Sequence, residues 1–395
     1  MKINAIQKFS PSTWKEKNIQ TFGVDLSFAN IPEWKRTKHV HRLHPYLGKF
    51  IPQLVEVFLR KYFKQGQTIL DPFLGSGTTL IEANLLNMNS IGIELSEFSY
   101  LIAKVKTQKY NLKLLEKEVL DILNKTKVFS QRVQMNQKSL LEKNFKAEPS
   151  EYFKTWYHPK ALKEIYFYRN LIPNYTNQDV LKIILSRAAR SARQIPHYDL
   201  ARPSRPVKTK YWCIKHKRYC YPIDNAIKFI NRYSWDTIQR IKEFDKLRTN
   251  ARITLLQGDA RVIKLPIGRE VDGIFTSPPY LGLIDYHDQH RYAYDLFDFK
   301  EHPEAEIGSP NNGNNYNNKK ESYKNDIIAV LQNMKKYMKE GAKIFIVVND
   351  KHSLYPEIAK NCGLKIMDVF HRPVLMRTER DNNRFSESIY YLTNE

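Results

Sequence analysis

Cysteine is scarce in this chain of 395 residues, with three in all, and no long run of apolar residues occurs anywhere. So few cysteines exclude a disulfide-stapled scaffold and favour a reducing compartment. The absence of an apolar run excludes a transmembrane helix, and the polar N-terminus lacks the core of a signal peptide. These absences predict a cytoplasmic protein without a membrane partner.

Acidic residues are few relative to basic ones. Asp and Glu number 41 against 64 Lys and Arg, which gives a formal net charge of +23. Such an excess indicates a polyanionic partner, with nucleic acid first and an anionic surface second. A basic protein with no nucleic-acid role is the alternative that charge alone leaves open.

The length predicts two or three domains, or one large domain with an insertion. Strand and helix patterns alternate at both ends of the chain, whereas helical periodicity and charge dominate the middle. This alternation is typical of a doubly wound α/β sheet with mostly parallel strands. We therefore predict one α/β domain from residues 1–107 and 252–395, with a mainly helical, basic insert at 108–251.

Within the α/β domain the apolar spacing predicts individual elements. The expected helices are 54–63, one directly after a glycine turn at 71–79, 97–107, 323–338, and one that ends before Gly363. The expected strands are 68–70, 90–94, one from Ile253, one from Val271 that ends before Pro278, 342–350, and a final hairpin of 364–374 and 386–392. Residues 1–36 are expected to be irregular, and the Asn- and Gly-rich stretch 308–320 to be a mobile loop.

The segment Asp71–Thr79 joins a strand end to a helix start through two glycines, Gly75 and Gly77. Glycines let the backbone approach a ligand closely, and the N–H groups of a helix N-terminus bind an anionic group such as a carboxylate or phosphate. The third glycine of the dinucleotide fingerprint and the Gly-Lys-Ser/Thr of a P-loop are missing. Taken alone, the segment leaves open a glycine turn that serves packing only.

Two further features lie at the ends of predicted strands. Glu94 follows the glycine turn by about 20 residues, where an acid accepts hydrogen bonds from ribose hydroxyls. Thr276–Tyr280 (TSPPY) directly follows an apolar strand. Its prolines stiffen the corner and leave carbonyls to accept hydrogen bonds, and Tyr280 offers a stacking surface to a planar ligand with an amino group. A solvated strand-end acid and a rigid turn with a packed tyrosine are the alternatives.

Asp71–Thr79 (DPFLGSGTT) resembles the S-adenosylmethionine-binding motif of DNA amino-methyltransferases, and TSPPY resembles their catalytic motif. Segments 41–53, 258–261, 284–297 and 372–392 are also similar to sequences of that family. The resemblance implies a Rossmann-like methyltransferase sheet and S-adenosylmethionine as cofactor, with Glu94 at the ribose and Asp259 at the adenine ring. The implied cofactor-binding residues are Lys49, Phe50, Asp71, Phe73, Gly75, Gly77, Thr78, Glu94 and Asp259. The implied target-base site consists of Ser277, Pro278, Pro279 and Tyr280.

The residue types of TSPPY suit methylation of an exocyclic amino group. The lone pair of such a nitrogen is delocalised into the ring, and acceptors such as the Ser277 hydroxyl and the Pro278 carbonyl orient its hydrogens and help to free it. Methylation at a ring carbon needs a cysteine nucleophile, and none lies near the motif. In the family that the chain resembles, a serine at this position accompanies cytosine and an aspartate accompanies adenine. We therefore predict cytosine, with adenine as the rival, in a base that leaves the duplex and stacks on Tyr280.

The insert carries much of the positive charge. Between Arg187 and Arg252, 17 basic residues stand against 5 acidic ones, and aromatic residues are interleaved. This composition predicts contacts with double-stranded DNA, and a solvated basic surface is the alternative. The residues expected to contact DNA are Arg187, Arg190, Arg193, Lys215, Lys217 and Arg218.

Three clusters of histidine, cysteine or acid are not expected to bind a metal. Cys213, His216 and Cys220 supply three ligands without a clear fourth. The histidines of 39–44 have no carboxylate to complete a site, and we expect them to serve the cofactor-side segment or phosphate contacts. The acids and histidines of 285–290 are expected to lie on a helix that shapes the base pocket.

The favoured hypothesis is a site-specific DNA methyltransferase that forms N4-methylcytosine in duplex DNA. By the same resemblance it would be the modification enzyme of a restriction-modification system, with a cognate restriction endonuclease as partner. The rivals are an adenine-N6 DNA methyltransferase, an RNA base methyltransferase, and a nucleic-acid-binding protein with an inactive methyltransferase fold.

Overall fold

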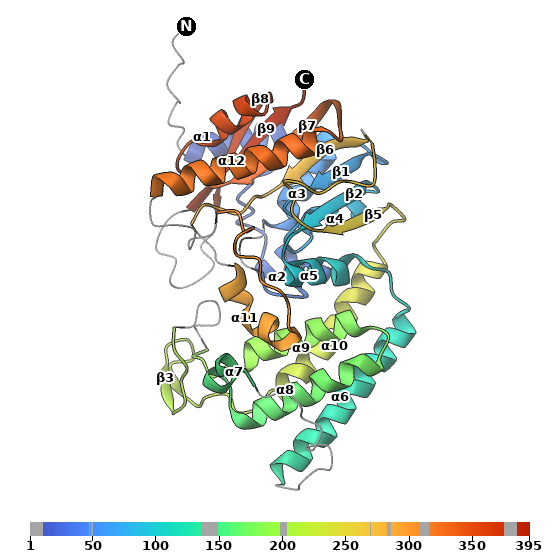
Figure 1. Ribbon diagram of the computed structural model, residues 1–395, viewed down its shortest axis with the longest axis vertical. Helices are drawn as coiled ribbons and strands as arrows, with labels where there is room; N and C mark the ends of the chain where they lie inside the picture. The colour runs from blue at the N-terminus through green and yellow to red at the C-terminus, as the bar shows by residue number, and fades with distance from the viewer. Residues whose placement is uncertain are drawn as a thin grey trace.

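The computed structural model of the chain describes residues 11–46, 48, 50–135, 149–197, 204–268, 270–282, 286–308, 316–374 and 385–395. It consists of a twisted sheet with helices on both faces and, beside the sheet, a group of mainly green and yellow helices from the middle of the chain (Figure 1). No helix in these ranges is long and apolar enough to cross a membrane.

Within the described residues, seven strands form one sheet in the order β5-β2-β1-β6-β7-β9-β8. Neighbouring strands are parallel except that β9 runs antiparallel to both β7 and β8. This arrangement confirms the predicted Rossmann-like α/β sheet with an antiparallel C-terminal hairpin. The strands are β1 (Thr68–Asp71), β2 (Asn89–Glu94), β5 (Ile253–Gln257), β6 (Val271–Thr276), β7 (Met338–Val348), β8 (Lys365–Val374) and β9 (Phe385–Thr393).

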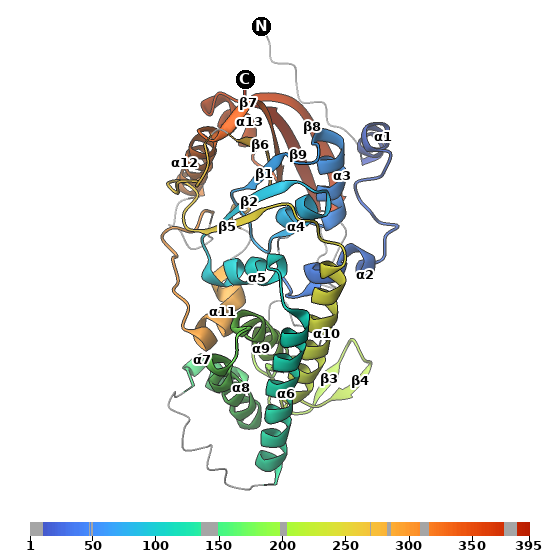
Figure 2. The same ribbon diagram turned by 90° about the vertical axis from the view of Figure 1, so that its right-hand side faces the viewer.

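Alternating side chains of the central strands give each face of the sheet its own core. Ile274 and Ile344 pack with apolar residues of α12 and α13, while Phe275 and Phe345 pack with residues of α3 on the other face. Figure 2 shows these helices on opposite sides of the sheet. The helices of this half are α1 (Pro11–Phe22), α2 (Glu33–Arg36), η1 (His39–Arg42), α3 (Pro52–Tyr62), α4 (Thr78–Leu85), α5 (Glu97–Thr107), α12 (Tyr316–Lys335) and α13 (Tyr355–Asn361).

Two expectations about this half are wrong. Residues 11–36 contain two helices rather than irregular chain alone, and residues 1–10 lie outside the described residues. Helix α1 packs on β8, where the rings of Trp14 and His371 stack at 4.9 Å and Asn18 donates to the His371 carbonyl. Residues 316–320 belong to α12 rather than to a loop, and residues 309–315 lie outside the described residues. The apolar face of the long α12 packs on the sheet, and this packing stabilises the helix through its polar first turns.

The insert folds mainly as helices and also contains a short hairpin that sequence reasoning missed. Arginines and aromatics in the stretch before α10 had suggested only a basic surface, yet two three-residue strands pair there in antiparallel fashion. The elements are α6 (Leu112–Gln134), α7 (Glu151–Trp156), α8 (Pro159–Leu171), η3 (Ile172–Asn174), α9 (Gln178–Ala192), β3 (Tyr211–Cys213), β4 (Arg218–Cys220) and α10 (Ile227–Asp245).

The insert shares its core with the α/β half. Helix α9 packs against α5, α8, α10 and α11 (Tyr286–Phe297), and α10 also packs against η1. Phe98 of α5, Ile184 of α9 and Tyr292 of α11 belong to one buried cluster. The boundaries predicted at 107 and 252 therefore cross a continuous core, and the division into two domains stays a prediction.

Candidate active site

A cleft lies at the carboxyl ends of β1, β2, β5 and β6. These strands are parallel, so the turns that follow them meet at one edge of the sheet, where ligands bind in open α/β sheets. The cleft encloses about 990 Å³, open solvent included. The predicted site residues that line it are Phe50, Phe73, Gly75, Thr78, Glu94, Asp259, Ser277 and Pro279. Asp71, Gly77, Pro278 and Tyr280 are not among its lining residues, and Lys49 lies outside the described residues.

The glycine turn is closed by Glu94. The backbone N–H of Gly75 donates to Glu94 Oε2 at 2.7 Å, and the N–H of Ser96 donates to Oε1 at 2.9 Å. Gly75 and Gly77 have φ values of 51° and 83°, the left-handed region that glycine tolerates. Burial raises the pKa of Glu94 to about 7, against the lowering effect of these two N–H groups. The carboxylate thus joins the ends of β1 and β2 while facing the cleft.

Asp71 acts from beneath the turn rather than from the cleft wall. Its side chain is buried, and its Oδ1 accepts hydrogen bonds from Thr276 Oγ1 at 2.6 Å and from the Phe73 N–H at 3.1 Å. Burial raises its pKa to about 6. In this structure the carboxyl positions Phe73, which does line the cleft, and a direct contact between Asp71 and a cofactor stays a prediction.

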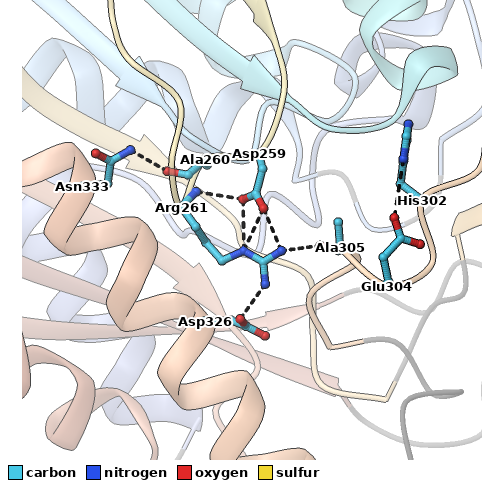
Figure 3. A network of polar contacts seen from close by, with 8 residues as sticks. All are labelled: Asp259, Ala260, Arg261, His302, Glu304, Ala305, Asp326 and Asn333. Atoms are coloured by element: carbon cyan, nitrogen blue, oxygen red, sulfur yellow. Dashed lines mark hydrogen bonds and ion pairs between the residues drawn. The ribbon is translucent and has the colours of Figure 1, made fainter.

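Asp259 is held in place by Arg261 (Figure 3). The Nε of Arg261 lies 3.1 and 2.9 Å from the two carboxylate oxygens of Asp259, and Nη2 lies 2.7 Å from Oδ2. Nη1 donates to Asp326 of α12 at 2.6 Å, so the guanidinium lies between two acids. This fork fixes the orientation of a carboxylate at the cleft wall and leaves part of its acceptor capacity for a ligand.

The TSPPY corner places the Ser277 hydroxyl on the cleft wall. Ser277 Oγ donates its hydrogen to the Val347 carbonyl of β7 at 2.9 Å, so the oxygen can only accept from a further partner. The Pro279 carbonyl accepts from Tyr323 at 3.0 Å. Tyr280 donates to Glu387 Oε1 at 2.9 Å, and Glu387 forms a buried ion pair with Arg372.

Comparison with known proteins agrees with this geometry. A model of the family described as DNA methylase matches residues 5–105. The chain is 41% identical to the type II methyltransferase M.MjaII of Methanocaldococcus jannaschii, over 97% of this chain and 85% of the relative. The chain belongs to the DNA amino-methyltransferase family.

A more distant sequence relative is also a type II methyltransferase. The type II methyltransferase M.BsoBI of Geobacillus stearothermophilus is 26% identical over 66% of this methyltransferase and 53% of its own length. A crystal structure of TrmN from Thermus thermophilus matches with 12% identity over 88% of this chain and 50% of that chain, at a TM-score of 0.32. That likeness is too distant to inform the substrate.

Two of the predicted DNA contacts in the methyltransferase are wrong, because their side chains are buried. Arg187 is 5% exposed, donates to Asp236 at 2.6 Å and lies over the ring of Tyr233. Arg193 is also 5% exposed and lies over the ring of Tyr292. Their six-residue spacing places them on one flank of α9 and of the residue that follows it, but that flank packs on α10 and α11 instead of facing solvent.

The other predicted contacts lie nearer the surface. Arg190 is half-buried, whereas Lys215, Lys217 and Arg218 are exposed on the hairpin of β3 and β4. The basic surface that solvent reaches is therefore on the hairpin rather than along α9.

Sequence reasoning missed Arg261, which holds the cleft residue Asp259, and several residues of the cleft wall of the methyltransferase. Arg261 stands two positions after Asp259 in the GDAR segment, and this close spacing was the available signal. Among the missed lining residues, Tyr46 stands in the segment 41–53 that resembles the family, although no role was assigned to it. Others stand in segments without a recognisable pattern: Ser96, Ser99, His302, Ala305, Glu306 and Ile307.

The histidines before α3 do have a carboxylate neighbour. His41 Nε2 lies 2.7 Å from Glu82 of α4, and His39 is also within reach of that carboxylate. All three histidines of 39–44 are buried, which rules out the expected phosphate contacts. Lys38 already neutralises Glu82 at 3.0 Å, so this cluster is an internal ion-pair network of the methyltransferase.

A second cluster contradicts the expectation that no fourth ligand accompanies Cys213, His216 and Cys220. His197, which follows α9, brings a ring nitrogen into the same group. Sequence spacing did not reveal it because 15 residues separate His197 from Cys213.

Proposed function

We propose that the chain transfers a methyl group from S-adenosylmethionine to the exocyclic amino group of cytosine in duplex DNA, forming N4-methylcytosine. The observation that carries the proposal is Ser277, a hydroxyl acceptor fixed by Val347 on the wall of a cleft that also holds Glu94 and Asp259. Membership of the DNA amino-methyltransferase family and the similarity to type II DNA methyltransferases support it.

The residues present suit S-adenosylmethionine by the chemistry of their donors and acceptors. Glu94 offers a carboxylate to a ribose diol, and Asp259 offers one to an exocyclic amino group of adenine. The N-terminus of α4, directly after the glycine turn, offers backbone N–H groups to the amino-acid carboxylate. When bound, the cofactor supplies an electrophilic methyl group on a sulfonium.

The protein's part in the reaction is positioning and electrostatics. Ser277 would accept a hydrogen bond from the target amino group and so orient its nitrogen lone pair for methyl transfer. The bound cofactor would supply the methyl group and retain the sulfur as a thioether, and the proton lost from the amino group would pass to solvent. Tyr280 follows the cleft-lining Pro279 and is held by Glu387, and we assign its ring as the stacking surface that an extruded base would reach.

The type II methyltransferases among the relatives support a further assignment. We place the chain as the modification enzyme of a restriction-modification system, whose cognate endonuclease would share its DNA site. Methylation then blocks that endonuclease at the same sequence.

Nucleoside mass spectrometry tests the proposed reaction. Unmethylated genomic DNA is incubated with the protein and S-adenosylmethionine, digested to nucleosides, and compared with reactions lacking the cofactor. N4-methylcytosine is the expected product. N6-methyladenine would keep the enzyme class and overturn the assignment of the base, while unmodified DNA would overturn the DNA methyltransferase activity and direct the same assay to RNA.

A further inference from the structure

Four metal-ligating side chains converge where the hairpin of β3 and β4 meets the segment after α9. Cys213 and Cys220 are the last residues of β3 and β4, and His216 lies in the turn between these strands. His197 approaches from the other side. One ligand atom from each of the four lies within 4.8 Å of all the others.

The distances between ligand atoms match the edges of a metal tetrahedron. Nδ1 of His197 lies 3.9 Å from Sγ of Cys213, and Nδ1 of His216 lies 3.5 Å from Sγ of Cys220. A tetrahedral zinc ion at ~2.0–2.3 Å from each ligand places its ligand atoms about 3.3–3.8 Å apart. These two pairs are therefore pre-arranged to within a few tenths of an ångström.

The hairpin has little else to hold it. Within the described residues 211–221, only the two cysteine side chains are buried. Trp212, Tyr219 and Tyr221 are 52%, 60% and 70% exposed. An isolated two-stranded hairpin of this length is marginal in water, and a structural metal is a common substitute for a missing core.

We propose that His197, Cys213, His216 and Cys220 bind one Zn²⁺ ion, which fastens the hairpin to the end of α9. Two thiolates and two imidazoles form a donor set that selects zinc, and four protein ligands leave no open position for catalysis. None of the four lines the cleft, so the role of the ion is structural.

Tyr211 of β3 also contacts this histidine. The backbone N–H of His197 donates to Tyr211 Oη at 3.2 Å, which holds the segment after α9 beside the hairpin. The same hydroxyl lies 3.0 Å from Nδ1 of His197, and a zinc ion bound by Nδ1 would replace that contact. The zinc site stands independently of the reaction proposed for the cleft.

Metal analysis of the full-length protein tests the site. Protein purified without chelator is expected to contain about one zinc per chain. Cys213→Ser and Cys220→Ser should lose it, while Cys362→Ser should retain it, because Cys362 is buried against the Ile328 carbonyl in the other half. Cobalt substituted for zinc should give thiolate charge-transfer absorption, which Cys213→Ser and Cys220→Ser should weaken or remove. It should also give the visible bands of a tetrahedral ion, which His197→Gln should shift or weaken.

The wild-type protein alone can overturn the proposal, whether or not the variants fold. Metal-free protein that takes up no zinc in competition with a chelator under reducing conditions would refute the site. A disulfide between Cys213 and Cys220 in the freshly purified protein, seen as a mass lower by two hydrogens and confirmed by peptide mapping, would also refute it.

Discussion

Ser277 donates its hydroxyl hydrogen to the carbonyl oxygen of Val347, 2.9 Å away. The Val347 carbonyl belongs to β7, the strand beside the one that ends at the TSPPY corner, so the neighbouring strand fixes the hydroxyl orientation. A donor committed to the protein leaves an oxygen that accepts, which is what a target amino group requires.

Ser277→Ala is expected to lower kcat by about 100-fold without changing the dissociation constant of S-adenosylmethionine. The loss follows from removing one pre-oriented hydrogen-bond partner of the reacting group. Single-turnover methylation and calorimetric cofactor binding measure the two quantities. Ser90→Ala, which removes a buried hydroxyl on β2 away from the cleft, is the matched control. Full activity in Ser277→Ala would refute the role of this hydroxyl.

The affinity for the nucleoside part of the cofactor should rise with pH through about 7. Burial raises the pKa of Glu94 to about 7, so the free protein holds a proton on this carboxyl below neutrality. Ribose hydroxyls donate to the ionised form, and binding must therefore displace that proton. Below the free-state pKa the affinity should fall by up to about tenfold per pH unit.

Methylthioadenosine is the best probe for this effect, because it has the ribose and adenine but no titrating amino acid. Calorimetry from pH 5.5 to 8.5 is expected to show the slope in the wild type and a flat, weaker profile in Glu94→Gln. Asp71 is a second buried acid, and burial raises its pKa to about 6. The variant Asp71→Asn therefore shows how much of the pH dependence comes from Asp71 rather than from Glu94. A slope that persists in Glu94→Gln would exclude Glu94 as its source.

Arg261→Lys should raise the KM for S-adenosylmethionine by roughly tenfold while kcat changes little. Lysine keeps the charge but loses the planar fork that holds both oxygens of Asp259. Steady-state kinetics with saturating DNA measure the split between KM and kcat. Arg60→Lys, in an exposed ion pair with Glu56 on α3, controls for the exchange of arginine by lysine. An unchanged KM would mean that cofactor binding does not depend on Arg261 holding the carboxylate of Asp259.

Part of the site could be predicted from the sequence, because the spacing of residues along the chain was enough to show which of them meet. Consecutive parallel strands end at one edge, so Gly75 and Glu94, 19 positions apart, were predictable neighbours, and they share a hydrogen bond. Burial of Arg187 could not be predicted, since periodicity identifies a flank of α9 but not the helix that covers it. Helix α1 was missed because its partner β8 lies some 350 residues away in the chain.

Gly77→Ala and Gly66→Ala should separate backbone strain from site geometry. Both glycines have φ near +80°, so each alanine should cost about 1–2 kcal/mol of stability. Only Gly77 lies in the glycine turn, and an added Cβ there would meet Ala103 Cβ at 3.2 Å, whereas the one at Gly66 meets nothing within 4 Å. Thermal unfolding should show a loss in both variants, and cofactor affinity should fall only in Gly77→Ala. Equal affinities would reduce the turn to a packing role.

Replacing the exposed cations of the hairpin by neutral residues should weaken DNA binding and make the affinity less dependent on salt concentration. Lys215, Lys217 and Arg218 are exposed. The plot of log K against log salt concentration has a negative slope, and each phosphate contact that is lost makes this slope shallower by about 0.9. The triple exchange to glutamine should therefore flatten the slope by up to about 2.7. Fluorescence anisotropy with a duplex at several salt concentrations measures the slope, and metal content confirms an intact hairpin.

Arg187→Gln is the contrasting variant. It breaks the ion pair of a buried arginine with Asp236, which keeps its partner Arg240, and should cost about 1.5–3 kcal/mol of stability while leaving the slope unchanged. If instead Arg187→Gln alters the slope and the hairpin variant does not, DNA binds along α9 after local opening, and the hairpin is not the DNA-binding surface.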